Sequence, residues 1–135
     1  MKNKFLFIES ETRPWGSFYV INDQPEYKIK RIEVNPGSRL SYQYHNGRAE
    51  TWVIIEGKAK VTINDKTENY STGETVIIPR KAKHRIENIT TENGRNPLLF
   101  GDVIKKDEFI EMALALGNVS SNYKICWNDA ESSIL

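Results

Sequence analysis

The stretch PGSRLSYQYHNGRAETWVIIEG, residues 36–57, decides the fold of this chain. It joins two runs of strand-forming residues, 40–45 and 51–55, through a turn. Similar β-branched and aromatic runs, separated by turn residues, recur at residues 17–21, 27–34, 59–63, 75–78, 84–89 and 98–103. About eight short strands at this spacing predict an all-β fold, either an antiparallel sandwich or a barrel.

A second stretch, GETVIIPRKAKHRIEN at residues 73–88, carries a strand, a turn and His84. The chain has only one other histidine, His45, which lies in the first stretch. Because side chains alternate between the faces of a strand, three polar residues are expected on one side: Ser41, Gln43 and His45. The turn after His45 then returns the chain, which brings Glu50 back beside it.

These two stretches resemble the paired motifs of the cupin superfamily. The resemblance implies a cupin fold, which is a double-stranded β-helix or jelly-roll barrel. It also implies a metal site, with Gln43 standing where many cupins have their first histidine. The implied ligands are Gln43, His45, Glu50 and His84.

Two imidazoles, a carboxylate and an amide oxygen form a mixed nitrogen and oxygen set. Such a set suits zinc, manganese, iron, cobalt or nickel, and an open coordination position would be typical of a catalytic site. Two other interpretations stay open. The histidines are ordinary surface or core residues, or the chain keeps the cupin fold and has lost the metal.

The length predicts one small domain, because 135 residues suffice for a single core. We expect a single cupin domain over residues 1–135, with the barrel at about 13–104 and a short C-terminal helix and tail at about 105–135. The helix is predicted for Asp107 to Leu116 from its apolar spacing. The alternation Tyr-x-Ile-x-Trp at residues 123–127 favours a further strand.

Charge and targeting signals limit the partners. The 19 basic and 18 acidic residues nearly cancel, which argues against nucleic acid or a membrane surface as a partner. The single cysteine, Cys126, cannot form an internal disulfide, and the first residues have too short an apolar run for a signal peptide or membrane span. We therefore expect a cytoplasmic protein.

We also expect a homodimer, because Tyr42, Tyr44 and the aromatic C-terminus offer an apolar surface.

Three pieces of the chain carry a resemblance more specific than the one to cupins in general. They are Arg13-Pro14-Trp15-Gly16-Ser17, residues 27–63 and residues 77–88. They look like the type II phosphomannose isomerase domain, which is often the C-terminal part of bifunctional enzymes that also carry a mannose-1-phosphate guanylyltransferase. The likeness covers over half of the chain. It implies a mannose-6-phosphate isomerase that interconverts mannose 6-phosphate and fructose 6-phosphate, or acts on a related sugar phosphate.

The chain departs from that family at two places. The family commonly has a run of histidines before Arg-Ala-Glu, whereas Asn46 and Gly47 precede Arg48 here. The usual glycine of the second stretch is replaced by Lys81. The first departure puts the proton-transfer step in doubt, and the second changes a turn near the expected pocket.

The resemblance also implies roles in catalysis. Arg48 would bind the phosphate or stabilise an enediolate, and Glu50 would be the general base if it is not a tight metal ligand. The expected substrate contacts are Lys30, Tyr42 and Arg48. Lys30 and Arg31 lie on opposite faces of their strand, so at most one of them points inward.

Rival functions come from other classes. One is a non-catalytic cupin that binds a sugar or nucleotide sugar, which the missing histidine run favours slightly. A metal-dependent oxygenase fits the ligands but not the Arg-Pro-Trp-Gly and Arg-Ala-Glu elements. A metal-free cupin epimerase would need a histidine for proton transfer, and both histidines already have a role as ligands.

Overall fold

The computed structural model describes residues 6–91 and 97–106. Within these ranges the chain forms nine β-strands. They are β1 (Glu9–Arg13), β2 (Gly16–Asp23), β3 (Tyr27–Val34), β4 (Arg48–Glu56), β5 (Lys58–Ile63), β6 (Lys66–Ser71), β7 (Thr75–Ile78), β8 (His84–Asn88) and β9 (Leu98–Lys106). No helix in the described ranges is long and apolar enough to cross a membrane.

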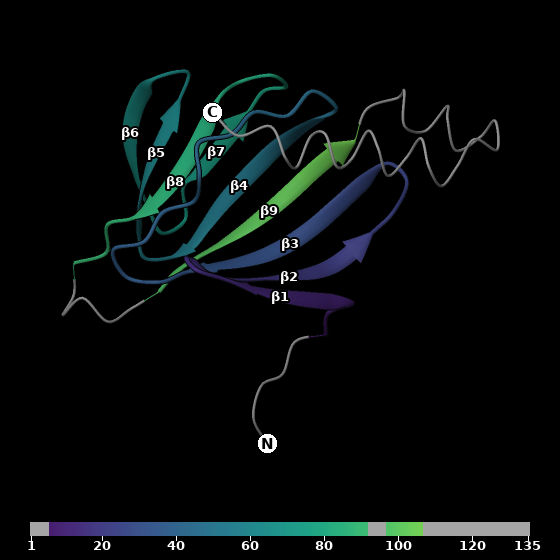
Figure 1. Ribbon diagram of the computed structural model, residues 1–135, viewed down its shortest axis with the longest axis horizontal. Coiled ribbons are helices and arrows are strands. Elements are labelled where there is room, and N and C mark those ends of the chain that lie inside the picture. Colours follow the sequence, from purple (N-terminus) through teal and green to yellow (C-terminus); the bar gives the residue numbers. More distant parts are fainter. Residues whose placement is uncertain (1–5, 92–96, 107–135) are drawn as a thin grey trace.

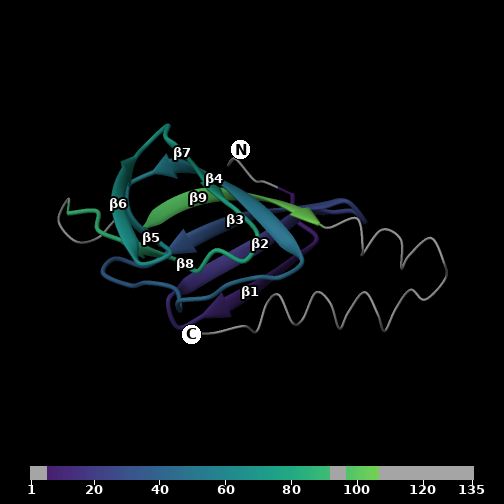
Figure 2. The same cartoon turned by 90° about the horizontal axis from the view of Figure 1, so that it is seen from above.

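The strands form two antiparallel sheets that face each other (Figures 1 and 2). The large sheet has the order β1-β2-β3-β9-β4-β7, and the small sheet has the order β6-β5-β8. The hydrophobic core lies between them, because its buried side chains come from strands of both sheets. They include Ile32, Val34, Trp52, Ile54, Val61, Val76, Ile78, Ile86, Leu98 and Phe100. This all-β architecture confirms the predicted fold class.

Most of the predicted strands are present, including the inward alternation of Glu50, Trp52 and Ile54 on β4 and of Ala59 and Val61 on β5. The alternation arises because one face of each strand packs into the core.

The strand predicted at residues 40–45 is wrong. This segment touches β8 only through isolated bridges, between Arg39 and Glu87 and between Gln43 and His84. The Gln43 and His84 backbones exchange two hydrogen bonds, of 3.0 and 2.7 Å. The segment is therefore tied to β8 at single points, without a continuous ladder.

Two strands escaped prediction, β1 and β6. Both lie at the edge of a sheet, and almost all of their side chains are exposed. Backbone pairing with β2 and β5 holds them in place, so their sequences carry no apolar alternation. The helix predicted at 107–116 and the strand-like run at 123–127 lie outside the described residues.

Candidate functional site

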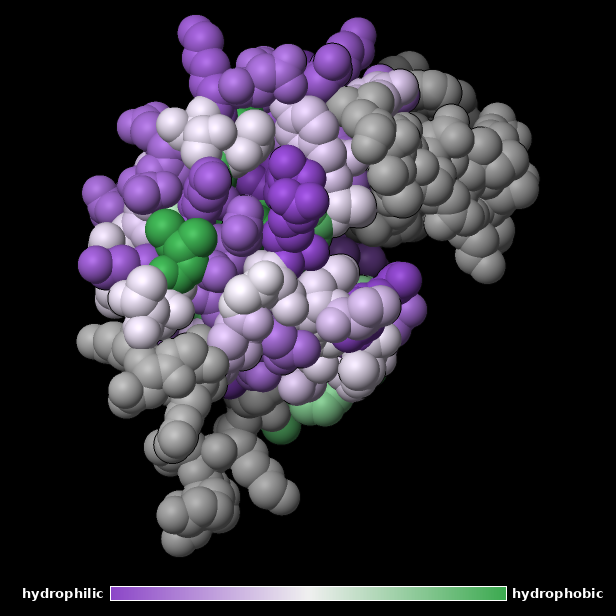
Figure 3. Space-filling model, turned by 60° about the vertical axis from the view of Figure 1, so that its left-hand side comes forward, coloured by the Kyte–Doolittle hydropathy of each residue, from purple (hydrophilic) through white to green (hydrophobic). Residues whose placement is uncertain are grey.

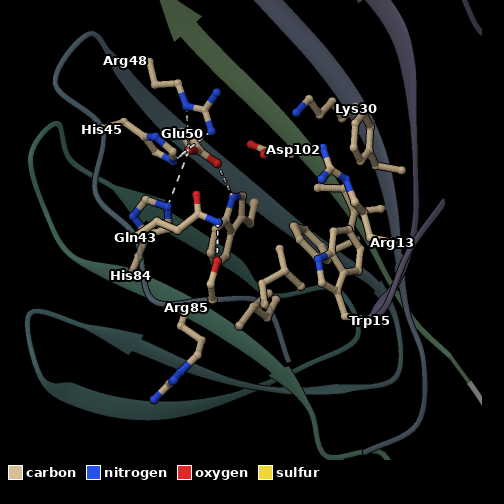
Figure 4. Close-up of a pocket in the computed structure, with 17 residues that line it drawn as sticks. Arg13, Trp15, Lys30, Gln43, His45, Arg48, Glu50, His84, Arg85 and Asp102 are labelled. Carbon is tan, nitrogen blue, oxygen red and sulfur yellow. Dashed lines mark hydrogen bonds and ion pairs between the residues drawn. The ribbon is translucent and has the colours of Figure 1, made fainter. Parts of the chain in front are cut away.

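A pocket of about 210 Å³ opens between the two sheets (Figure 4). The 40–45 segment, the start of β4 and β8 supply one side of it, including Gln43, His45, Arg48, Glu50 and His84. The opposite side comes from β1, β2, β3 and the β1–β2 turn, and includes Arg13, Trp15, Phe18 and Lys30, while Asp102 on β9 lies between the two sides. The site therefore depends on both sheets.

Three potential metal ligands converge at this pocket. The side chains of His45, Glu50 and His84 are all buried, and their ligand atoms lie within 4.8 Å of one another. Glu50 Oε2 is 3.3 Å from His45 Nε2 and 3.7 Å from His84 Nε2. The turn after His45 thus returns Glu50 beside it, as the sequence predicts.

The donor set fits a divalent metal ion. Ligand bonds of about 2.1 Å put neighbouring ligand atoms roughly 3.0–3.4 Å apart, close to the separations between Glu50 and the two imidazoles. His84 Nδ1 donates to the Ala82 carbonyl at 3.0 Å, so its Nε2 presents a lone pair towards Glu50. Such orientation by a backbone carbonyl is common for histidines that bind metals.

Arg48 is a further cation in this cluster. Its Nε donates to Glu50 Oε2 at 3.0 Å, and its Nη2 lies 2.8 Å from His45 Nε2. Trp52 Nε1 donates to the other oxygen, Glu50 Oε1, at 2.9 Å. Both carboxylate oxygens of Glu50 are therefore hydrogen-bonded, and a metal ion would share His45 and Glu50 with the guanidinium.

The two buried carboxyl groups of the pocket have opposite pKa shifts. Burial alone would raise the pKa of Glu50, but the charge of Arg48, the neighbouring His84 imidazole, a hydrogen bond with Asp102 and the neighbouring His45 imidazole together lower it below its usual range. Burial, then the charge of Glu50 and a hydrogen bond shared with it, raises the pKa of Asp102 well above its ordinary value. The two directions mean that Glu50 loses its proton before Asp102 does as the pH rises.

The other predicted site residues divide into two groups. Gln43 and Lys30 line the pocket, and the Gln43 amide donates to Ser41 Oγ at 2.9 Å. Tyr42 does not line it, because its hydroxyl donates to Asp65 at 2.8 Å and Arg85 lies over its ring. The ligand role of Gln43 and the ligand contact of Lys30 stay predictions, whereas the geometry does not bring Tyr42 to the site.

Asp102 is the main pocket residue that the sequence analysis missed. Leu98, Phe100, Asp102 and Ile104 all point inward from β9, so Asp102 is the one acidic residue in an apolar series. This interruption of the apolar alternation is the feature of the sequence that could have pointed to Asp102 as a pocket residue. Within the described ranges, its buried Oδ1 has no hydrogen-bond partner.

The chain matches the family model described as "Mannose-6-phosphate isomerase C-terminal" over residues 3–111. Mannose-1-phosphate guanylyltransferase 2 of Escherichia coli O157:H7 is 43% identical over 87 residues, which are 64% of this chain and 18% of that protein. Mannose-1-phosphate guanylyltransferase of Escherichia coli K12 is 38% identical over 112 residues, which are 79% of this chain and 23% of that protein. The matched part thus spans about a fifth of these relatives.

The prediction that the chain is itself an isomerase is wrong by this comparison. These relatives are named as guanylyltransferases, which are transferases, although only part of each matches.

Among solved structures, the cupin domain of Schizosaccharomyces pombe Cnp3 superimposes with a TM-score of 0.64 at 15% identity, covering 84% of this chain and 77% of that domain. The chain therefore has a cupin fold and belongs to the family of mannose-6-phosphate isomerase C-terminal domains.

Proposed function

We propose that the chain is a non-catalytic cupin module that binds a sugar phosphate next to a divalent metal ion. The observation that carries this proposal is the convergence of buried His45, Glu50 and His84 in a pocket that also has a cationic lining. The metal would be zinc, manganese, iron, cobalt or nickel, held by these three side chains with Gln43 as a fourth ligand. When bound, it would offer open coordination positions to oxygen atoms of the ligand.

The charge of the pocket favours an anionic ligand. Three cationic side chains, Arg13, Lys30 and Arg48, line it against the carboxyl groups of Glu50 and Asp102, whereas the Arg85 side chain points away towards the Tyr42 ring. The raised pKa of Asp102 reduces its negative charge further. Since the whole chain has a net charge of only +1, this cationic character is local to the pocket.

The size of the pocket favours a small ligand. Its volume of about 210 Å³ is below the roughly 300–1,000 Å³ that is usual for drug-sized ligands. A monosaccharide phosphate therefore fits better than a whole nucleotide sugar. The names of the relatives suggest mannose 1-phosphate as the first candidate, with GDP-mannose as the alternative.

Calorimetry on the full chain tests this proposal. The protein is stripped with a chelator, reloaded separately with each of the five metals, and titrated with mannose 1-phosphate, mannose or GDP-mannose. We expect stoichiometric metal binding and tighter binding of mannose 1-phosphate than of mannose.

His84→Ala should weaken metal binding by at least about a hundredfold. Lys83→Ala, at the exposed neighbouring position, is the control and should not. If no sugar phosphate binds in any metal form, the proposal is wrong. The homodimer, the cytoplasmic location, and the lack of a nucleic-acid or membrane partner stay predictions.

A further inference from the structure

The Arg13-Pro14-Trp15-Gly16 element, which the proposed metal site does not use, forms part of the pocket wall. Arg13 and Trp15 both line the pocket, together with Phe18 on β2 and Lys30 on β3. In Figure 4, Arg13, Trp15 and Lys30 lie across the pocket from His45 and His84. One end of the pocket therefore carries the potential metal ligands, and the other carries two cationic side chains beside aromatic rings.

Lys30 places a buried positive charge at the end opposite the histidines. Only 7% of the residue is exposed, and its Nζ lies 4.5 Å from the centre of the Phe18 ring. Its charge also acts on Asp102, which lies opposite Lys30 in the β3–β9 register. A ligand anion in the pocket would accept charge-assisted hydrogen bonds from this ammonium group.

Arg13 brings a second cation to the same ring. Its guanidinium carbon lies 5.8 Å from the centre of the Phe18 ring. Its ion pair with Glu11, at 2.9 Å, joins side chains that are each about half exposed. Exposed pairs of this kind are weak, so the guanidinium can turn towards an anion at small cost.

We infer that Arg13 and Lys30 form a phosphate subsite, with Trp15 and Phe18 as its apolar walls. It takes the phosphate monoester of a sugar phosphate and directs the hydroxyl-bearing end towards His45, Glu50 and His84. This inference rests on the proposed function and specifies the orientation of the ligand. It also gives the Arg-Pro-Trp-Gly element a role in binding.

The test compares phosphorylated and unphosphorylated ligands. Calorimetry on the full, metal-loaded chain measures binding of mannose 1-phosphate, mannose and inorganic phosphate to the wild type and to Lys30→Met. Methionine keeps the length of the side chain and removes the charge. We expect Lys30→Met to lose at least about tenfold in affinity for both phosphate probes and to bind mannose unchanged.

Lys28→Met is a matched control. Lys28 lies two residues away on the same face of β3 and is 9% exposed, but it does not line the pocket. It should leave the affinity for all three probes unchanged. Arg13→Gln, at an exposed position that should not disturb folding, should reproduce the Lys30 effect more weakly.

The outcomes separate the two proposals. If the wild type binds mannose 1-phosphate and Lys30→Met weakens it no more than it weakens mannose, the subsite is wrong and the proposed function stands. The same holds if Lys28→Met has the same effect as Lys30→Met. If no phosphate probe binds the wild type, both are wrong.

Discussion

Arg48 lies where it would compete with the proposed metal ion, because it donates to His45 Nε2 and to Glu50 Oε2. We expect Arg48→Met to bind divalent metal at least about tenfold more tightly than the wild type, since a charge-assisted hydrogen bond no longer has to be broken. Competition against a chromogenic chelator at pH 7.5 measures this.

The control for this change is Arg31→Met on the outward face of β3, where the arginine pairs with Glu33. It should leave metal affinity as it is. Metal binding by Arg48→Met that equals or falls below the wild-type affinity would show that the guanidinium helps to hold the ion.

Asp102 gives a prediction about pH. Its pKa is raised in the folded chain above the ordinary 3.8, so the folded state keeps a proton that the unfolded chain releases. Its contribution to stability is therefore fully present below about pH 4 and is lost as the pH rises towards the folded pKa.

Asp102→Asn keeps an N–H donor for Glu50 and removes this titration. The variant should gain stability relative to the wild type as the pH rises from 4 towards the raised pKa of Asp102. Urea unfolding in EDTA at several pH values measures the difference. A difference that does not change with pH would mean that Asp102 is ionised in the folded chain.

Lys81 occupies a backbone conformation that suits glycine. Its φ is 66°, and its N–H donates to the His45 carbonyl at 2.8 Å. We expect Lys81→Gly to raise the free energy of unfolding by about 0.5–1 kcal/mol, because relief of the left-handed strain exceeds the added entropy of the unfolded chain. Thermal unfolding checks this, and a lower midpoint would contradict it.

The β1–β2 turn depends on Gly16. Its φ is 150°, and a Cβ there would lie 2.0 Å from the Glu33 carbonyl oxygen on β3. Since a backbone oxygen cannot move away cheaply, Gly16→Ala should lower the free energy of unfolding by about 2–4 kcal/mol. Urea unfolding measures the loss.

Gly73→Ala is the matched control for this position. Gly73 also has a positive φ, of 91°, but a Cβ there would have no atom within 4 Å. It should cost only the strain of about 1 kcal/mol. Equal losses for the two variants would mean that the close approach to β3 has no effect of its own.

How far the sequence predicts these strands depends on what holds each one. The alternation of β3, β4, β5 and β9 is visible because one face of each packs into the core. β1 and β6 are held by backbone hydrogen bonds at sheet edges, which no side-chain pattern records.

The same distinction applies to the site. The convergence of His45, Glu50 and His84 could be predicted from their spacing in the two sequence stretches and from the turn after His45, although residues 40–45 form no strand. Trp15, Phe18 and Asp102 reach the pocket only through the packing of β1, β2 and β9, which local spacing does not encode.

The outer face of the large sheet carries exposed apolar side chains, and it bears on the predicted homodimer. Val53, Ile77 and Val103 are 38%, 70% and 43% exposed, and Thr51 pairs with both Ile77 and Val103 in the register. By contrast, the face of the molecule in Figure 3 is mostly hydrophilic. We therefore expect two copies to associate through the large sheet.

Light scattering should give twice the mass of one chain for the wild type. Ile77→Lys should give the mass of one chain without a lower unfolding midpoint, because the side chain is already exposed. Asn69→Lys on β6 is the control and should remain a dimer. A monomeric wild type would show that this apolar face stays exposed to water.

The guanidinium of Arg48 also bears on whether this chain would need the proposed metal ion in order to fold. Many small metal-binding domains are unfolded without their ion, because metal binding supplies the free energy of folding. Here Glu50 is already neutralised by a residue two positions away on the same strand. We therefore expect the chain to fold without the ion, so that a metal-free population would be folded protein in which Arg48 holds the carboxylate that an ion would bind.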